Sequence, residues 1–375
     1  MFYKNARIFC NDCHFRTGAF EVKDGLFGEI LPENVPADAI DLEGATVIPG
    51  LIDVHNHGNS GADFSDGDYE GLKKMAKYLA QNGITSFAPA SMTLPYEVLA
   101  KAFATAKQLK EEAPEGHSRL MGIQMEGPYF SEKKKGAQNG EYLKTPDFEG
   151  FKKLYEDCGG LVGIADVAPE LPGAAEFIEK ASKLCTVSVA HTDSDYEHAR
   201  EAFARGATHL THLYNAMPGI HHRNPGVIPA AVEAPTVRAE LICDGMHIHP
   251  ASVRLAFAMF GGERMILVSD ALRCCGMPDG EYELGGQPVF LAGGVAKLAD
   301  GTLAGSATNL YDCMKNAILF GIEEADAVRS ATINPACALG VQDRVGSIAT
   351  GKIADFIVCR SDYTGRRVFM SGKEI

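Results

Sequence analysis

Two histidines that stand two positions apart are the first residues whose spacing suggests chemistry. His55 and His57 close an apolar segment that has the composition of a β-strand. Residues two apart on a strand face the same side, so both imidazoles would point the same way. Neutral imidazole nitrogens are common ligands of transition metals. Taken alone, the pair fits a metal site and a polar strand end about equally well.

Four further side chains suited to metal binding or proton transfer follow other apolar segments: Glu126, His191, His212 and Asp270. In a (β/α)8 barrel the carboxyl ends of all strands meet at one mouth, which holds the active site. Imidazole and carboxylate ligands favour zinc, iron, manganese or cobalt over magnesium. The set contains no thiolate, which is typical of a catalytic site that keeps one position open for water. We therefore predict a metal site at the mouth of a barrel.

Asp270 is the residue best suited to transfer protons. It comes directly after the apolar run Ile266–Val268 and Ser269, so a carboxylate would stand at the barrel mouth. An aspartate at this place is also a favoured helix N-cap, and the two roles are compatible. A bound metal lowers the pKa of water toward about 7. A carboxylate that accepts the proton of such a water contributes roughly 10²–10⁴ in rate.

Strand-like and helix-like segments alternate from residue 47 onward, a pattern typical of a parallel sheet. Asp68–Gln81, for example, places its apolar residues on one helical face and is followed by Gly83. Eight β-rich segments are the number that closes a barrel, so we predict an α/β fold with a TIM-like (β/α)8 barrel. The eight segments are Val47–His57, Ile84–Ser91, Leu120–Glu126, Val162–Ala168, Thr186–His191, Ala207–His212, Val237–Asp244 and Met265–Asp270.

The two ends of the chain differ from its middle. Residues 1–48 and 346–375 contain short strands and turns, and neither piece is long enough to bury a core alone. We expect them to pair into one small β-sandwich domain built from both termini. Residues 49–345 would then form the catalytic barrel, with a β-hairpin inserted near 281–303 before its last helix.

Composition narrows the classes of protein that the chain can belong to. A formal net charge of −14 argues against nucleic-acid binding, which needs a basic surface. The longest apolar runs are too short to span a bilayer, and the first ten residues lack the pattern of a signal peptide. The 10 cysteines form no disulfide framework. We expect a reduced, cytoplasmic enzyme with no nucleic-acid or membrane partner.

Five motifs stand out along the chain: Pro49–His57, Glu126–Pro128, Thr211–Met217, Ser269–Ala271 and Gly351–Asp355. Together they resemble the amidohydrolase superfamily and, within it, the N-acetylglucosamine-6-phosphate deacetylases. The first and last of them are shared by many amidohydrolases, whereas the second and third are narrower and indicate the deacetylases. The resemblance covers essentially the whole chain.

The resemblance implies a role for each matching residue. Glu126, His191 and His212 would bind the principal metal, and Asp270 would be the catalytic acid and base. Some relatives lack the histidine pair and hold one ion, so His55 and His57 imply a second. One or two divalent ions are expected, zinc or iron first, with manganese, cobalt or nickel as alternatives. The matching substrate contacts are Ala137, Gln138, Asn215, Ala216, Leu303, Ala304 and Gly305, with Arg223 and His247 as the phosphate contacts.

Gln138 departs from the pattern of these relatives. Many of them have a histidine in the place that Gln138 occupies in the run from Lys134 to Asn139. A glutamine amide can donate a hydrogen bond to an acetyl carbonyl or a sugar hydroxyl, but it cannot become a cation. We expect this difference to affect which sugar the protein prefers more than whether the reaction occurs.

The resemblance implies hydrolysis of N-acetyl-D-glucosamine 6-phosphate to D-glucosamine 6-phosphate and acetate, in amino-sugar catabolism or cell-wall recycling. It also implies a homodimer whose substrate site is shared between subunits. Two alternatives remain open. The substrate is another N-acetylhexosamine phosphate, such as the galactosamine epimer, or the chain is a catalytically inactive scaffold. The second alternative conflicts with the presence of every expected metal ligand.

Overall fold

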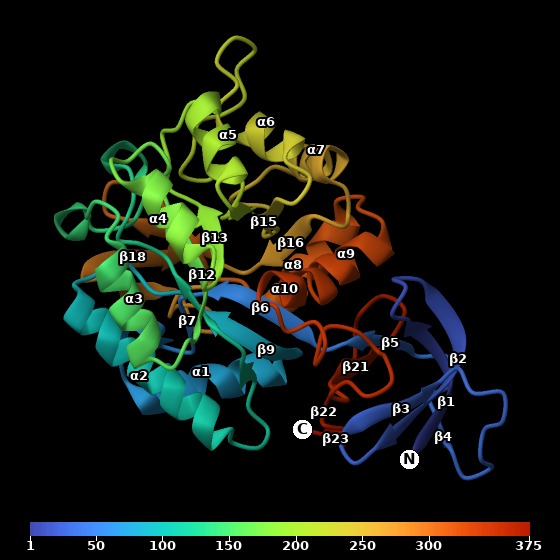
Figure 1. Ribbon diagram of the computed structural model, residues 1–375. Helices are drawn as coiled ribbons and strands as arrows, with labels where there is room; N and C mark the ends of the chain where they lie inside the picture. The colour runs from blue at the N-terminus through green and yellow to red at the C-terminus, as the bar shows by residue number, and fades with distance from the viewer.

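The computed structural model describes all 375 residues and has a large part built of strands and helices beside a smaller β-rich part (Figure 1). Eight parallel strand segments form the inner wall of the large part, which confirms the predicted (β/α)8 barrel. In chain order they are β6 (Leu51–Asn56), β9 (Ile84–Pro89), β10 with β11 (Arg119–Leu120 and Ile123–Met125), β12 (Val162–Val167), β13 (Thr186–Val189), β14 (Ala207–Leu210), β15 (Arg238–Ile242) and β16 (Met265–Val268).

Hydrogen bonds between neighbouring edges close these strands into a ring. One sheet holds β6, β9 and β10, and the other runs from β11 to β16. A parallel bridge between Ala90 and Gln124 joins β9 to β11, and one between Asn56 and Ala271 joins β6 to the segment after β16. The backbone N–H of Asp270 donates to the carbonyl of His55 over 2.9 Å at this second junction. The polar strand ends therefore lie around one mouth.

The first predicted strand, Val47–His57, is two strands in the structure. Thr46–Pro49 (β5) belongs to the small β-rich part, and the barrel strand β6 begins only at Leu51. Gly50 between them lies so close to Thr85 that a Cβ atom on it would be 2.1 Å from the threonine Oγ1. The chain can pass from one sheet to the other here because the residue has no side chain.

Amphipathic helices cover the outside of the barrel. Helix α1 shows how the sequence sets their ends, because the Asp68 carboxylate accepts hydrogen bonds from the backbone N–H groups of Glu70 and Gly71 at its start. Leu72, Met75 and further apolar residues of α1 are buried against the strands. The helices are α1 (Tyr69–Gln81), α2 (Tyr96–Glu112), α3 (Phe148–Asp157), α4 (Ala174–Ala181), α5 (Tyr196–Ala204), α6 (Val227–Glu233), α7 (Pro250–Phe260), α8 (Leu310–Leu319), α9 (Glu324–Ser330) and α10 (Ile333–Ala338).

Both ends of the chain contribute to one eight-stranded sheet, and they lie side by side in Figure 1. Phe27 near one edge packs against Phe356, which lies several strands away, with ring centroids 5.9 Å apart. The sheet therefore curls over an apolar cluster of its own, which includes Tyr3 and Phe20. Its strands are β1 (Phe2–Phe9), β2 (Phe15–Lys23), β3 (Leu26–Ile30), β4 (Ile40–Asp41), β5, β21 (Phe356–Cys359), β22 (Arg367–Met370) and β23 (Lys373–Glu374).

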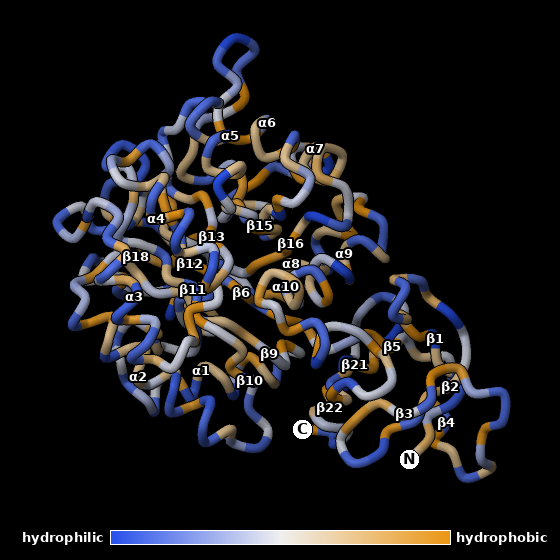
Figure 2. The backbone as a smooth tube through the Cα atoms, in the orientation of Figure 1, coloured by the Kyte–Doolittle hydropathy of each residue, from blue (hydrophilic) through white to orange (hydrophobic).

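The insertion before the last barrel helices is larger than the expected β-hairpin. It is a four-stranded antiparallel sheet of β17 (Gly280–Leu284), β18 (Gln287–Ala292), β19 (Val295–Leu298) and β20 (Leu303–Ser306). A parallel bridge between Ser306 and Ala271 attaches β20 to the barrel mouth. The strand that carries the predicted substrate loop is thereby fixed beside the segment that carries Asp270. Figure 2 shows that the outer loops of both parts are largely hydrophilic.

Candidate metal centre

The backbone turns sharply at the ends of the strands that carry the predicted site. His191, His212 and Asp270 each stand two residues beyond a strand and have φ angles of 44°, 30° and 48°. Residues other than glycine rarely adopt this left-handed conformation, and such strain clusters at functional sites. These three side chains line one cavity together with Glu126, which directly follows β11.

Glu126, His191 and His212, which we call the first triad, converge on one point. The Nε2 atoms of the two histidines lie 3.1 Å apart, and each is 3.1 Å from Oε1 of Glu126. The Nδ1 atoms face the backbone carbonyls of Lys134 and Asn215 at 2.9 and 3.2 Å, and a carbonyl only accepts, so Nδ1 carries the proton. Each neutral ring then presents a lone pair at Nε2. These three electron-rich atoms require a positive charge between them, which fits a metal ion.

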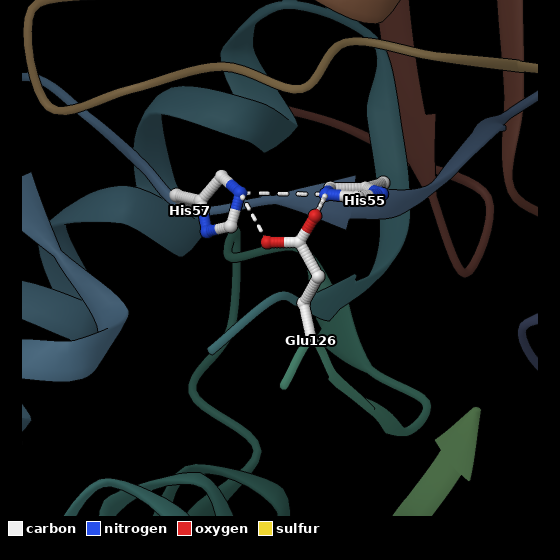
Figure 3. A group of neighbouring side chains, drawn as sticks. All are labelled: His55, His57 and Glu126. Atoms are coloured by element: carbon white, nitrogen blue, oxygen red, sulfur yellow. Dashed lines mark hydrogen bonds and ion pairs between the residues drawn. The ribbon is translucent and has the colours of Figure 1, made fainter. Parts of the chain in front are cut away.

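His55, His57 and the same Glu126 form a second triad, which Figure 3 shows. The two Nε2 atoms are 3.3 Å apart and lie 3.5 and 3.4 Å from the two carboxylate oxygens of Glu126. Nδ1 of His57 donates to the Ala90 carbonyl over 3.1 Å, and Nδ1 of His55 lies 2.9 Å from the Glu240 carboxylate. Both rings again turn a lone pair toward Glu126. The donor set fits a second cation with Glu126 as the shared ligand.

Charges within the site favour ionised carboxylates. Burial raises the pKa of Glu126, but when the surrounding histidines are protonated at Nε2 as well as Nδ1, their hydrogen bonds and charge, above all from His191 and His212, leave it well below its usual value. Burial likewise raises the pKa of Asp270, but a hydrogen bond from Nε2 of His57, when that ring is protonated in the same way, helps to bring it below its usual value. Oδ1 of Asp270 lies 3.3 Å from Nε2 of His57. An ionised Asp270 beside the triads has the charge state that a proton acceptor needs.

Gln138 is held against the first triad. Its backbone-facing oxygen Oε1 accepts from the N–H of Thr93 over 2.7 Å, which fixes the orientation of the amide. Its Nε2 then donates to Oε2 of Glu126 over 2.5 Å. The residue is 3% exposed. One of its two N–H groups is thus bound to a predicted metal ligand, and the other remains for a substrate.

A cavity of about 260 Å³ opens over the two triads. All predicted metal ligands except the deeper His55 border it, as does Asp270. The cavity also brings together eight of the nine predicted substrate contacts. These are Ala137, Gln138, Asn215, Ala216, His247, Leu303, Ala304 and Gly305.

Arg223 is the predicted substrate contact that does not line this cavity. It borders a different hollow with Asp193 and Pro225, and its Nη1 lies 2.8 Å from Nε2 of the neighbouring His222. The segment between β14 and α6 that carries it projects away from the body at the top of Figure 1. Within one chain, therefore, the arginine stands apart from the metal centre.

Several polar side chains beneath the triads were missed by the sequence analysis. Glu240 is fully buried on β15 and contacts His55. Asp53, also fully buried, accepts from Ser269 Oγ over 2.5 Å, and burial raises its pKa to about 6. A carboxylate inside an otherwise apolar barrel strand was the available signal, because charged groups are rarely buried without a partner.

Comparisons of this chain with known proteins agree on one family. The model of the amidohydrolase family matches residues 46–375. The N-acetylglucosamine-6-phosphate deacetylase of Bacillus subtilis is 38% identical over 96% of this chain and 90% of its own length. The N-acetylgalactosamine-6-phosphate deacetylase of Escherichia coli is 32% identical over 94% and 93%.

A solved structure agrees with these relatives. The N-acetyl-D-glucosamine-6-phosphate deacetylase of Mycobacterium smegmatis, in complex with N-acetyl-D-glucosamine 6-phosphate, superposes with a TM-score of 0.93. It is 30% identical and covers 100% of this chain and 98% of its own. None of the helices here has the length and apolar character needed to cross a membrane. The chain belongs to the amidohydrolase family and, within it, to the N-acetylglucosamine-6-phosphate deacetylases.

Proposed function

We propose that this protein hydrolyses the acetamide of N-acetyl-D-glucosamine 6-phosphate and releases D-glucosamine 6-phosphate and acetate. The observation that carries the proposal is the convergence of Glu126, His191 and His212 below a cavity that Asp270 also borders. Relatives across bacteria and animals that bear this activity in their names support it. The proposed setting is amino-sugar catabolism or cell-wall recycling.

Glu126, His191 and His212 would hold the principal metal ion, and His55 and His57 would hold a second with Glu126. Zinc or iron suits this nitrogen and oxygen donor set, with manganese, cobalt or nickel as alternatives. A bound ion would polarise the acetyl carbonyl and acidify an attacking water.

Asp270 would transfer the protons of the reaction. As the oxygen of the attacking water bonds to the acetyl carbon, a proton of that water passes to the Asp270 carboxylate. The same proton then passes to the amide nitrogen as its bond to the acetyl carbon breaks. The immediate products are acetic acid and the free amine; the acid gives up the second proton of the water to the amine, which leaves acetate and an ammonium group, and Asp270 returns to its ionised state. Its position beside both triads, 3.3 Å from His57, suits this exchange.

The remaining cavity residues would bind the sugar phosphate. Asn215 and Ala216 border the cavity next to the first triad, and the edge formed by 303–305 lies on the inserted sheet. The free N–H of Gln138 is available to the acetyl carbonyl or a hydroxyl. His247 is paired with Asp244 at 2.7 Å, which favours its cationic form and suits a phosphate contact.

We also propose a homodimer in which Arg223 serves the site of the neighbouring subunit. The hydrophilic tip of the projecting segment supports this reading (Figure 2), as does the absence of Arg223 from the cavity of its own chain. A planar guanidinium suits phosphate oxygens. The enzyme would work in the cytoplasm, with residues 1–48 and 346–375 as a small β domain and 49–345 as the catalytic domain.

A mixing experiment tests whether Arg223 acts across the dimer. Asp270→Asn protein is expected to be nearly inactive, and Arg223→Ala protein is expected to be slow when the phosphorylated substrate is kept well below its raised KM, so the assay uses that low concentration. After the subunits are exchanged, a mixed dimer contains one site with an intact Asp270 and an Arg223 from the neighbour. Activity should therefore reappear on mixing. If Arg223 acts within its own chain, no mixed dimer holds a complete site and mixing restores nothing.

A second candidate substrate is N-acetyl-D-galactosamine 6-phosphate, because one relative at 32% identity is named for it. Acetate release should be measured with metal-loaded enzyme on both epimers, with and without the 6-phosphate. The proposal predicts the highest kcat/KM on the phosphorylated glucosamine derivative. Faster reaction of the galactosamine epimer would reassign the substrate. Release from none of them, together with absence of bound metal, would favour the inactive scaffold.

A further inference from the structure

Glu240 is a buried carboxylate that touches a ligand from each triad. It lies on β15, below the metal centre, and is fully buried. Its Oε2 lies 2.9 Å from Nδ1 of His55 and accepts from the backbone N–H of His212 over 3.1 Å. Its Oε1 has no hydrogen-bond partner, and Nε2 of His209 is 3.8 Å away. A carboxylate is rarely placed so deep without a charge to balance it.

The contact with Glu240 determines which nitrogen of His55 is free. An ionised carboxylate is an acceptor, so Nδ1 of His55 must carry the proton and Nε2 presents its lone pair toward Glu126. The other three histidines of the triads are fixed by backbone carbonyls, which cannot change with the sequence. His55 alone depends on a side chain. A charge-assisted hydrogen bond also makes the ring a stronger ligand.

The second triad needs this support more than the first. Its shared ligand Glu126 already accepts a hydrogen bond from Gln138 on Oε2, the oxygen that faces His57. A second divalent ion would add positive charge to a buried site where Glu126 and Asp270 are the carboxylates that face the Nε2 atoms of His55 and His57. Glu240 contributes a further negative charge at hydrogen-bond distance from His55.

We propose that Glu240 is a positioning residue that holds the second metal ion, because it fixes His55 with its Nε2 lone pair toward Glu126. This inference rests on the proposed metal-dependent function. The first ion, held by Glu126, His191 and His212, binds without it. Occupancy of the second position, and not the fold or the first position, is the property that Glu240 controls.

The test compares Glu240→Gln with Asp166→Asn in full-length protein. Asp166 is a matched control, because it is equally buried inside the barrel but bonds to Gln124 and Thr211 and to no triad side chain. Metal per subunit is measured by elemental analysis after loading with zinc, and cobalt-loaded samples are compared by visible absorption. Thermal unfolding of the metal-free proteins monitors the fold.

The wild type and Asp166→Asn should bind two ions. Glu240→Gln should keep one and bind the second about 10- to 100-fold more weakly, the usual cost of losing a partner of a metal-bound histidine. Equal affinity for both ions in Glu240→Gln and wild type would overturn the inference. One ion per subunit in an active wild type would also overturn it while leaving the proposed function standing. A wild type with neither metal nor acetate release would instead remove the proposed function.

A measurement on the wild type covers the case in which Glu240→Gln does not fold. Nitrogen-15 NMR of histidine-labelled protein reports which ring nitrogen carries the proton. In the zinc-loaded enzyme, His55 should be protonated at Nδ1 and metal-bound at Nε2. A His55 that is protonated at Nε2 would contradict the role of Glu240.

Discussion

The floor and the rim of the active-site cavity are built in different ways. The floor consists of six buried side chains at the ends of five barrel strands of one chain, each at most 8% exposed. The rim residues proposed to bind phosphate are the partly buried His247 and the exposed Arg223. The floor comprises Glu126, His191, His212, His55, His57 and Asp270.

This difference separates the chemistry from substrate recognition. The floor is complete within one chain, because a closed barrel and left-handed turns determine where its side chains lie. The rim is incomplete, because Arg223 stands on a projecting segment away from the cavity. Floor substitutions should therefore reduce kcat and metal content, whereas rim substitutions should change KM for phosphorylated substrates alone.

Substitution of Glu126, the ligand that both triads share, should have the largest effect on metal content and activity. Glu126→Gln should lose both ions and lower kcat/KM by about 10⁴-fold or more, since metal polarisation contributes several kcal/mol and about 1.4 kcal/mol is a factor of ten. Elemental analysis and acetate release measure the two effects. Retention of a full complement of metal in this variant would break the assignment of Glu126 as the common ligand.

Asp270→Asn should separate proton transfer from metal binding within the floor. The amide cannot accept the proton, so kcat should fall by roughly 10²–10⁴-fold. Metal content should stay at the wild-type level, because the triads are unchanged. Near-normal turnover in this variant would show that another group transfers the proton.

Arg223→Ala tests the proposed phosphate contact at the rim. Loss of a charged hydrogen bond costs about 1.5–3 kcal/mol, so KM for N-acetylglucosamine 6-phosphate should rise about 10- to 100-fold. The unphosphorylated sugar should react as in the wild type, and metal content should not change. Equal effects on both sugars would contradict a phosphate contact.

The smallest effect concerns the charge of His247. Burial lowers the pKa of His247, but its bond to the Asp244 carboxylate outweighs burial and raises it. The cation, and with it affinity for phosphate, should persist below this raised pKa and fall as pH increases through it. Asp244→Asn keeps an oxygen for the backbone N–H groups of Met246 and His247 but removes the charge.

In Asp244→Asn, the rise of KM should therefore begin at a lower pH than in the wild type. KM is measured above about pH 7, where the substrate phosphate is already fully ionised. The unphosphorylated sugar serves as the control and should show no such shift. If the KM profiles of the variant and the wild type superimpose, His247 does not bind the substrate phosphate.

The barrel was predictable because eight β-rich segments alternate with helix-like segments, and several of these strands end in a residue that can bind a metal or transfer a proton. The same pattern placed Glu126, His191, His212 and Asp270 at strand ends, which the structure brings to one mouth. The boundary at Gly50 was not predictable, because it depends on the approach of Thr85 from the next strand. The full extent of the insertion was missed because its short strands gain stability only by pairing with one another.

Hydrogen bonds between side chains that are far apart in the chain could not be predicted from the sequence. The bond from Gln138 to Glu126 depends on a loop whose path periodicity does not define. Glu240 appeared as one residue in an apolar strand, and its partner His55 is far away in the chain. Residue types therefore predicted the candidate ligands, while the groups that orient those ligands emerged only from the structure.

Anomalous X-ray diffraction from crystals of the metal-loaded enzyme would locate the ions that the two triads are proposed to hold. Data collected above the absorption edge of the bound metal should show a strong peak bonded to Oε1 of Glu126 and to Nε2 of His191 and His212. A second peak is expected between His55, His57 and Glu126. An enzyme that releases acetate but shows no peak at the first triad would contradict the account.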